Sequence, residues 1–138
     1  MRYLSLSAFA LAGLLAVAFG LRYLGTREFM PYHATVAGKP WSAIEPPLQA
    51  VILGMLRVCG SGLLGCGIAL LWLLLPLQRG ETWAAWAALT SNLATTLPIL
   101  YVVTWLRRIE PGAKTPVVPT VAAIVLVCAG TLAFFLAR

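Results

Sequence analysis

The sequence predicts an all-α, polytopic membrane protein built as a four-transmembrane-helix bundle, and three observations support this. Of its 138 residues, 61% are apolar and 10% are charged, whereas soluble domains are about 45–50% apolar and about 25% charged. The apolar residues form four runs, each at least as long as the roughly 20 residues that a helix needs to cross a bilayer. None of the runs alternates as a strand does, and an open sheet is not stable in lipid. A disordered chain, a disulfide scaffold and a conventional soluble enzyme are excluded.

The first predicted helix covers residues 4–24. Ala16-Val17-Ala18 resembles a signal-peptide cleavage site. The apolar run continues past that site to Leu24, however, which is long enough to span the membrane. We therefore expect an uncleaved transmembrane helix.

A long first loop, residues 25–47, follows. It contains the only histidine and two of the four acidic residues. Its apolar side chains would otherwise face water, so we expect the loop to fold back on the end of the bundle and to bury Phe29 and Trp41. Loops held by a rigid scaffold often carry function.

The second predicted helix, residues 48–77, carries Arg57 within apolar sequence. An ionised arginine at membrane depth costs several kcal/mol unless it is paired. We therefore expect Arg57 to point into the bundle and to bind Glu45 or Glu28. Tyr32 and His33 complete this candidate polar cluster. The alternative is that the true span is residues 58–77 and that Arg57 binds a lipid headgroup at the interface.

The same helix is rich in glycine after Arg57. Gly60, Ser61, Gly62 and Gly65 provide small side chains at the spacing that lets helices approach closely in lipid. We expect these residues to form a packing face toward a neighbouring helix of the same chain or of a second subunit. A ligand cleft is the weaker interpretation.

The third predicted helix, residues 83–106, follows a tight turn at residues 78–82, which makes the second and third helices antiparallel neighbours. It carries Ser91, Asn92 and Thr95. The amide of Asn92 lies near the middle of the span and needs a hydrogen bond, for which we expect a partner on the second helix. A polar path through the membrane is the alternative. The fourth helix covers residues 117–136, and the whole chain forms one transmembrane domain.

The remaining residue patterns point to no reaction. All four acidic residues lie at the ends of the apolar runs, and one histidine without a second histidine or a CxxC makes a weak metal site. We therefore expect no catalytic set, no metal and no cofactor. Basic residues at the ends of apolar runs are typical of contact with lipid headgroups, and we expect no binding of nucleic acid.

The distribution of lysine and arginine predicts the orientation. The side that holds both termini and the turn carries Arg2, Arg79 and Arg138. The opposite side carries more, namely Arg22, Arg27, Lys39, Arg107, Arg108 and Lys114, with Arg57 near it. Cytoplasmic loops are the more basic ones. We therefore expect the first and third loops in the cytoplasm and both termini outside.

The order of these features resembles small bacterial four-helix membrane proteins of the DoxX-like type. In this chain a first helix leads to a long loop that ends in prolines. There follow Arg57, the glycine-rich segment 60–62 and a tight basic turn at 78–81. The resemblance implies a four-helix bundle in a bacterial inner membrane and no specific reaction.

Three functions remain open from the sequence. The first is a non-enzymatic accessory or structural component of a membrane complex, with lipid, other membrane proteins or further copies of itself as partners. The second is a small oligomeric carrier or channel for an anion or polar solute. The third is a membrane enzyme that acts on a lipid or quinone at the side of the first loop.

Overall fold

The computed structural model describes residues 1–137 and confirms the predicted all-helical class. Four helices are long and apolar enough to cross a membrane. The elements are α1 (Arg2–Gly25), α2 (Pro31–Ala37), the short 3-10 helix η1 (Trp41–Ala43), α3 (Pro46–Gln78), α4 (Thr82–Ile109) and α5 (Val117–Leu136). The ends of the long helices lie within about one turn of their predicted positions.

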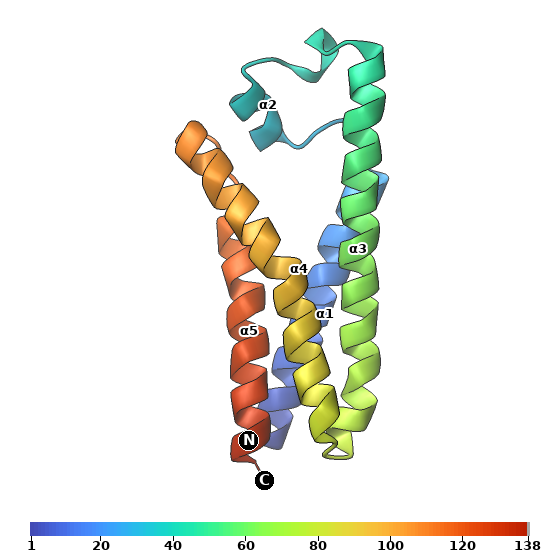
Figure 1. Ribbon diagram of the computed structural model, residues 1–138, viewed down its shortest axis with the longest axis vertical. Coiled ribbons are helices and arrows are strands. Elements are labelled where there is room, and N and C mark those ends of the chain that lie inside the picture. The colour runs from blue at the N-terminus through green and yellow to red at the C-terminus, as the bar shows by residue number, and fades with distance from the viewer. Residues whose placement is uncertain (138) are drawn as a thin grey trace.

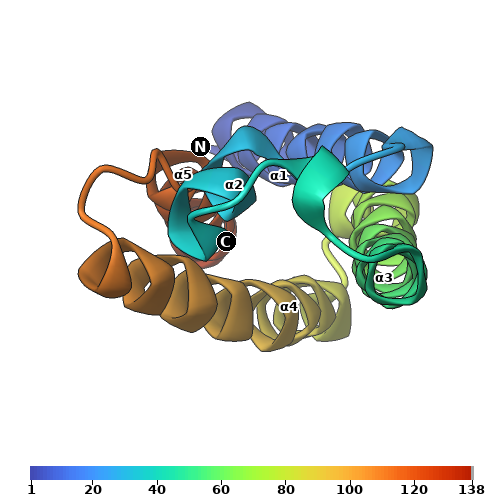
Figure 2. The same cartoon turned by 90° about the horizontal axis from the view of Figure 1, so that it is seen from above.

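The four long helices run up and down the long axis of the molecule. Both termini lie at the end that carries the turn between α3 and α4, and α2 and η1 cover the other end (Figure 1). Seen from above, α1, α3, α4 and α5 are arranged around the long axis of the bundle, and α2 crosses over its end (Figure 2). Helix α1 packs against both α3 and α5, and α4 packs against α3 and α5.

Glycines set the contact between α1 and α3. A Cβ atom added to Gly60 would lie 2.9 Å from the carbonyl oxygen of Gly20, and one added to Gly67 would lie 2.7 Å from that of Gly13. The two backbones therefore approach as closely as only glycine allows, which is a common way to pack helices in lipid. Gly60 and Gly67 are two helical turns apart and lie on the same face of α3.

The predicted packing face is wrong for Gly62, Gly65 and Ser61 within this chain. A Cβ atom on Gly62 or Gly65 would have nothing within 4 Å, and Ser61 is exposed and donates to the carbonyl of Val58. The reason is helical period: at 100° per residue, Gly62 and Gly65 lie roughly half a turn away from Gly60 and Gly67. Packing of this outer face against a second subunit stays a prediction.

Small residues also set where α4 meets the bundle. Ala84, Ala85 and Ala88, in the first turns of α4, are fully buried in a core with Phe9 and Leu70. Farther along, α4 leans away from α3 toward the end covered by α2 (Figure 1). A second apolar cluster lies at that end and is formed by Tyr23, Phe29, Met30 and Leu56. The bundle therefore has two packed regions.

The first loop folds on the end of the bundle, as expected. Phe29 is 7% exposed and its ring contacts that of Trp41, with the ring centroids 4.9 Å apart, although Trp41 itself is only half-buried. Helix α3 has 33 residues, or about 50 Å, well beyond the roughly 30 Å of a hydrocarbon core. Its first turns thus support the loop, and the side chain of Gln49 donates to the carbonyls of Trp41 and Ile44 at 3.0 Å each.

We expect Gly67→Ala to destabilise the fold and Gly65→Ala not to. The new methyl group at residue 67 would meet the backbone of α1 at 2.7 Å, which costs about 1–3 kcal/mol. At residue 65 the methyl group meets open space, and alanine favours the helix by up to about 1 kcal/mol. Thermal unfolding in mild detergent measures both. Equal melting temperatures would show that the α1–α3 contact is not limiting.

Candidate functional site

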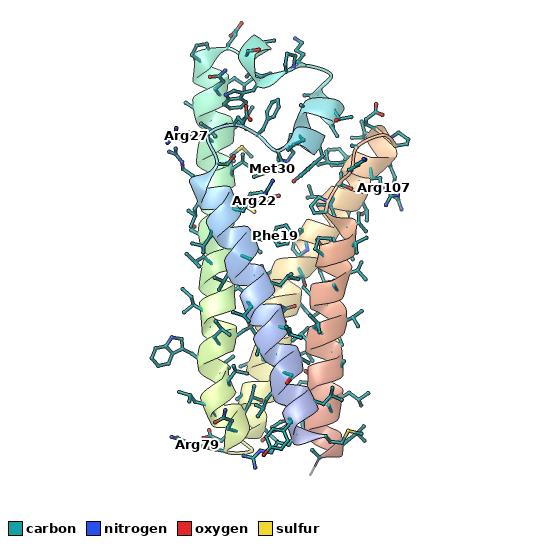
Figure 3. All side chains as sticks on the ribbon, turned by 180° about the vertical axis from the view of Figure 1, so that it is seen from behind. Phe19, Arg22, Arg27, Met30, Arg79 and Arg107 are labelled. Atoms are coloured by element: carbon teal, nitrogen blue, oxygen red, sulfur yellow. The ribbon has the colours of Figure 1, made fainter. Side chains whose placement is uncertain are left out.

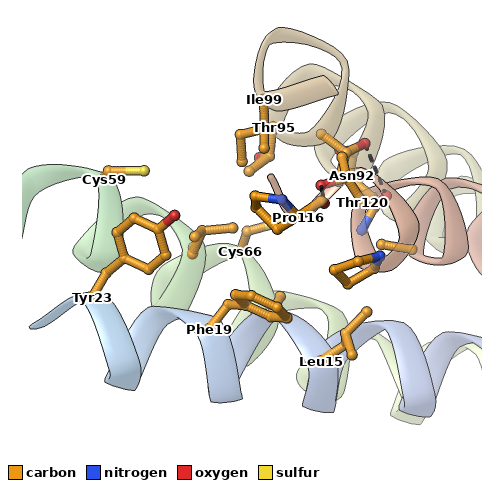
Figure 4. A pocket seen from close by; sticks show the side chains of 15 residues that line it. Leu15, Phe19, Tyr23, Cys59, Cys66, Asn92, Thr95, Ile99, Pro116 and Thr120 are labelled. Atoms are coloured by element: carbon orange, nitrogen blue, oxygen red, sulfur yellow. Dashed lines mark hydrogen bonds between the residues drawn. The ribbon is translucent and has the colours of Figure 1, made fainter. Parts of the chain in front are cut away.

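The candidate site is a pocket among α1, α3, α4 and α5, in the half of the bundle nearer to α2 (Figure 4). Its cavity has a volume of about 70 Å³, which is smaller than the roughly 300–1,000 Å³ of drug-sized ligand sites. The pocket lies between helices that are packed closely at the turn end and diverge toward the loop end. Its existence follows from the tilt of α4 away from α3.

The walls on α1 and α3 are apolar. Leu15, Ala16 and Phe19 come from α1 and Leu63 from α3, and Figure 4 shows Leu15, Phe19 and Tyr23 along one side of the cavity. These side chains offer hydrocarbon and aromatic surface to a ligand, which favours an apolar body over a fully hydrated one.

The wall on α4 is polar. Asn92 is 1% exposed and lines the pocket together with Thr95 and Thr96. The hydroxyl of Thr96 donates to the backbone carbonyl of Asn92 at 2.8 Å and lies 3.4 Å from its Oδ1, while Thr95 donates to the carbonyl of Ser91 at 3.0 Å.

The Nδ2 group of Asn92 donates no hydrogen bond among residues 1–137. It keeps a small exposed surface, because among the described residues the fully buried side-chain atom without a partner is Thr115 Oγ1. The pocket therefore presents N–H donors to whatever occupies it, because the threonine hydroxyl hydrogens are already used by backbone carbonyls.

A second, more polar pocket lies above the first, toward the loop end. It shares Phe19, Tyr23 and Pro116 with the deeper pocket and adds Arg22, Met30, Pro31, Tyr32 and Lys114. The hydroxyls of Tyr23 and Tyr32 are 2.7 Å apart and share one hydrogen bond. Burial raises the pKa of Tyr32 well above its ordinary value, with the hydrogen bond to Tyr23 adding to the effect. Tyr32 is therefore a neutral phenol at physiological pH.

His33 has a local structural role. The backbone N–H of Met30 donates to its Nδ1 at 3.2 Å and thereby caps α2. Its ring packs against those of Tyr32 and Phe29, at centroid distances of 4.1 and 6.2 Å. Burial lowers the pKa of His33, which keeps the imidazole neutral and able to accept this hydrogen bond.

The expected cluster around Arg57 does not form, and the prediction that Arg57 points into the bundle is wrong. Arg57 is exposed on α3, and no hydrogen bond or ion pair joins it to Glu28 or Glu45 in the part of the chain that the structure describes. The inward face of α3 at this level is taken by Leu56 and Gly60, which pack beneath the loop and against α1. Tyr32 and His33 do lie together, away from Arg57.

The polar residues predicted on α4 divide between two places. Asn92 and Thr95 line the pocket. Ser91 is exposed, donates to the carbonyl of Ala87 at 2.7 Å, and accepts a weak contact from the thiol of Cys66 at 3.9 Å through its own carbonyl. The expected bond from the Asn92 amide to α3 is not present among the described residues; the diverging helices leave a pocket there instead.

Other site residues were missed from the sequence. Phe19, Tyr23 and Thr120 line the deeper pocket, and Arg22 and Lys114 line the upper one. Each stands in an apolar run or a basic loop where many neighbours have the same character, so no local pattern distinguishes them. Within residues 1–137 no group of three His, Cys, Asp or Glu side chains is placed to hold a metal ion.

Comparisons with known proteins found no matching family model, no similar curated protein and no similar solved structure.

We expect the cap of α2 to weaken as the pH falls. Since the pKa of His33 is lowered by folding, its contribution to stability is complete above the unfolded value of about 6.5 and is lost as the pH falls through the folded value. Protonated Nδ1 cannot accept the Met30 N–H. Hydrogen exchange of residues 28–37, corrected for intrinsic rates, should accelerate below about pH 6.5. His33→Gln, which can accept the same bond without titrating, should remove this pH dependence; an unchanged profile in that variant would contradict the assignment.

Proposed function

We propose that this chain is a multi-pass protein of a bacterial inner membrane whose interhelical pocket binds a lipid-soluble, amphiphilic molecule, as a non-enzymatic binding component. The observation that carries the proposal is the amide of Asn92, which donates no hydrogen bond among residues 1–137 and lines a largely apolar pocket among four membrane-length helices. Binding to an accessory protein partner or to a second copy stays a prediction.

The outer surface supports placement in a bilayer. Large apolar side chains stand exposed along all four long helices, among them Leu14 on α1, Trp72 on α3, Leu97 on α4 and Val125 on α5. A soluble protein rarely exposes so continuous an apolar surface. Helix α5 has 20 residues, or about 30 Å, which matches a hydrocarbon core.

The charges support an orientation with the first and third loops in the cytoplasm. Arg22, Arg27 and Arg107 lie at the end of the bundle that the loops cover, and Arg79 lies at the opposite end (Figure 3). Basic residues are retained on the cytoplasmic side during insertion. Arg138, counted on the other side in the sequence, lies outside the described residues.

The pocket chemistry indicates the kind of ligand. The wall from Leu15 to Phe19 favours a hydrocarbon body, while Asn92 favours a ligand that carries a hydrogen-bond acceptor such as a carbonyl or hydroxyl oxygen. A molecule dissolved in the bilayer meets both demands. Helices α3 and α4 diverge at this level of the bundle (Figure 1).

The structure gives less support to the carrier and enzyme alternatives than to ligand binding. Arg57, the charged residue within the apolar sequence of α3, is not among the residues that line the pocket. Nδ1 of His33 accepts the backbone N–H of Met30, and no hydrogen bond joins either ring nitrogen to a carboxylate among residues 1–137, as an acid–base pair would require. No specific observation therefore favours a second function over ligand binding.

We expect Ala16→Phe to reduce the bound lipid-type ligand several-fold. Ala16 lines the pocket, so a phenyl ring there takes up space that the ligand needs. Ala18→Phe is the matched control, because Ala18 lies on the same helix but is exposed. Each protein is purified in mild detergent, and the molecules extracted from it are counted by mass spectrometry. Equal occupancy in both variants and the parent chain would refute the proposed pocket.

We expect Asn92→Leu to separate stability from binding. Its amide N–H groups have no partner among the described residues and Thr96 donates mainly to the Asn92 backbone, so the ligand-free protein should keep its stability or gain about 1 kcal/mol. The retained ligand should fall by about tenfold if it accepts a hydrogen bond from Asn92. Thermal unfolding after delipidation, together with the same extraction, measures both. A large loss of stability would show that the amide has a structural role instead.

A further inference from the structure

We propose that the upper pocket recognises the anionic headgroup of this amphiphile through Arg22 and Lys114, while the deeper pocket holds its apolar chain. The inference rests on the proposed binding function and specifies the class of ligand: a lipid with an apolar chain and a carboxylate or phosphate head.

The two pockets are adjacent, because they share Phe19, Tyr23 and Pro116 as lining residues. Arg22 comes from the last turns of α1 and Lys114 from the loop before α5. Figure 3 shows Arg22 between the levels of Phe19 and Met30, at the loop end of the bundle. Along α1, the interval from Leu15 to Arg22 corresponds to about 10 Å, so one molecule can place its head at Arg22 and its chain beside Leu15.

The positive charge of the upper pocket is not neutralised by the protein. No carboxylate lines this pocket, and neither Arg22 nor Lys114 forms an ion pair or side-chain hydrogen bond within residues 1–137. The nearest acidic residue along the chain from Lys114 is Glu110, and its Oε1 accepts the backbone N–H of Gly112 at 3.1 Å. Two cations beside an apolar cavity attract an anion whose remaining part is apolar.

The tyrosine pair adds a neutral donor. Tyr23 and Tyr32 have two hydroxyl hydrogens between them and share one hydrogen bond, so one hydroxyl hydrogen is left to donate to an oxygen of the headgroup. Both tyrosines line the upper pocket. The site thus offers two charged groups and one hydroxyl at its polar end and hydrocarbon at its other end.

The test compares two probes that differ only in the head: a long-chain fatty acid with a diazirine in its chain, and the fatty alcohol of the same chain. The protein is held in nanodiscs of phosphatidylcholine at mildly alkaline pH. Photocrosslinking yield against probe concentration gives the apparent affinity, and peptide mapping locates the adduct. We expect adducts on the pocket face of α1 around Leu15 and Phe19, with the acid binding at least about tenfold more tightly than the alcohol.

The double variant Arg22→Gln/Lys114→Gln should abolish the preference for the acid, and Arg27→Gln/Arg107→Gln should retain it. The control removes the same charge at the same end of the bundle from residues that do not line either pocket. Equal loss of preference in both double variants would assign the effect to the general surface potential and overturn the proposal.

Two further outcomes distinguish a failure of headgroup recognition from a failure of the proposed pocket. Equal binding of acid and alcohol to the parent chain would overturn headgroup recognition but leave the proposed pocket intact, whereas no crosslinking of either probe within the pocket would overturn both. Inorganic phosphate and acetate are added as competitors. We expect neither to displace the acid at millimolar concentration; displacement by phosphate alone would show that the site takes a free anion and would overturn the lipid assignment.

Discussion

The close approach of α1 and α3 is the constraint on which the rest of the structure depends. It is possible because Gly13, Gly20, Gly60 and Gly67 leave no side chain between the two backbones. A contact of this kind fixes the crossing and the register of both helices together. Helix α5 then packs on α1, joined to it by the hydroxyl of Ser5, which donates to the carbonyl of Gly130 at 2.7 Å. Helix α4 completes the bundle through α5 and the short turn to α3, and its position decides whether the interior is closed or open.

The two ends of the bundle differ because the side chains that α4 turns inward change from small and apolar to polar along its length. Its first turns present Ala84, Ala85 and Ala88, which pack without a gap, and its later turns present Asn92 and threonines. Pro98 removes one backbone hydrogen bond in the same helix, a break at which helices commonly bend. The pocket is therefore a consequence of one tight end and one divergent end, and α2 with its neighbouring loop covers the divergent end.

Apolar and basic side chains occupy different parts of the molecular surface: apolar ones lie along the sides of the bundle and basic ones lie mainly near one end. Apolar surface faces outward along the four long helices, and Arg22, Arg27 and Arg107 lie at the end that the loops cover (Figure 3). Arg57 is exposed on α3. That placement fits the alternative in which Arg57 reaches the interface, where a long side chain keeps its charge hydrated. Arg22 and Lys114 differ from it because they line a pocket. On the proposed function, ligand binding and the orientation in the membrane would therefore depend on some of the same cations.

The sequence by itself determined the fold class and the extent of each long helix, because length, hydropathy and the absence of alternation are properties of single segments. It also identified Asn92 and Thr95 as unusual, since polar groups stand out in apolar runs. Tertiary structure alone decided which glycines of α3 meet α1, that Arg57 faces outward, and that Phe19, Arg22, Tyr23 and Lys114 share a site. The physical reason is that a facing direction depends on how each helix is rotated and tilted against its neighbours. When a helix is apolar on all sides, its hydrophobic pattern does not indicate which side faces the neighbouring helices.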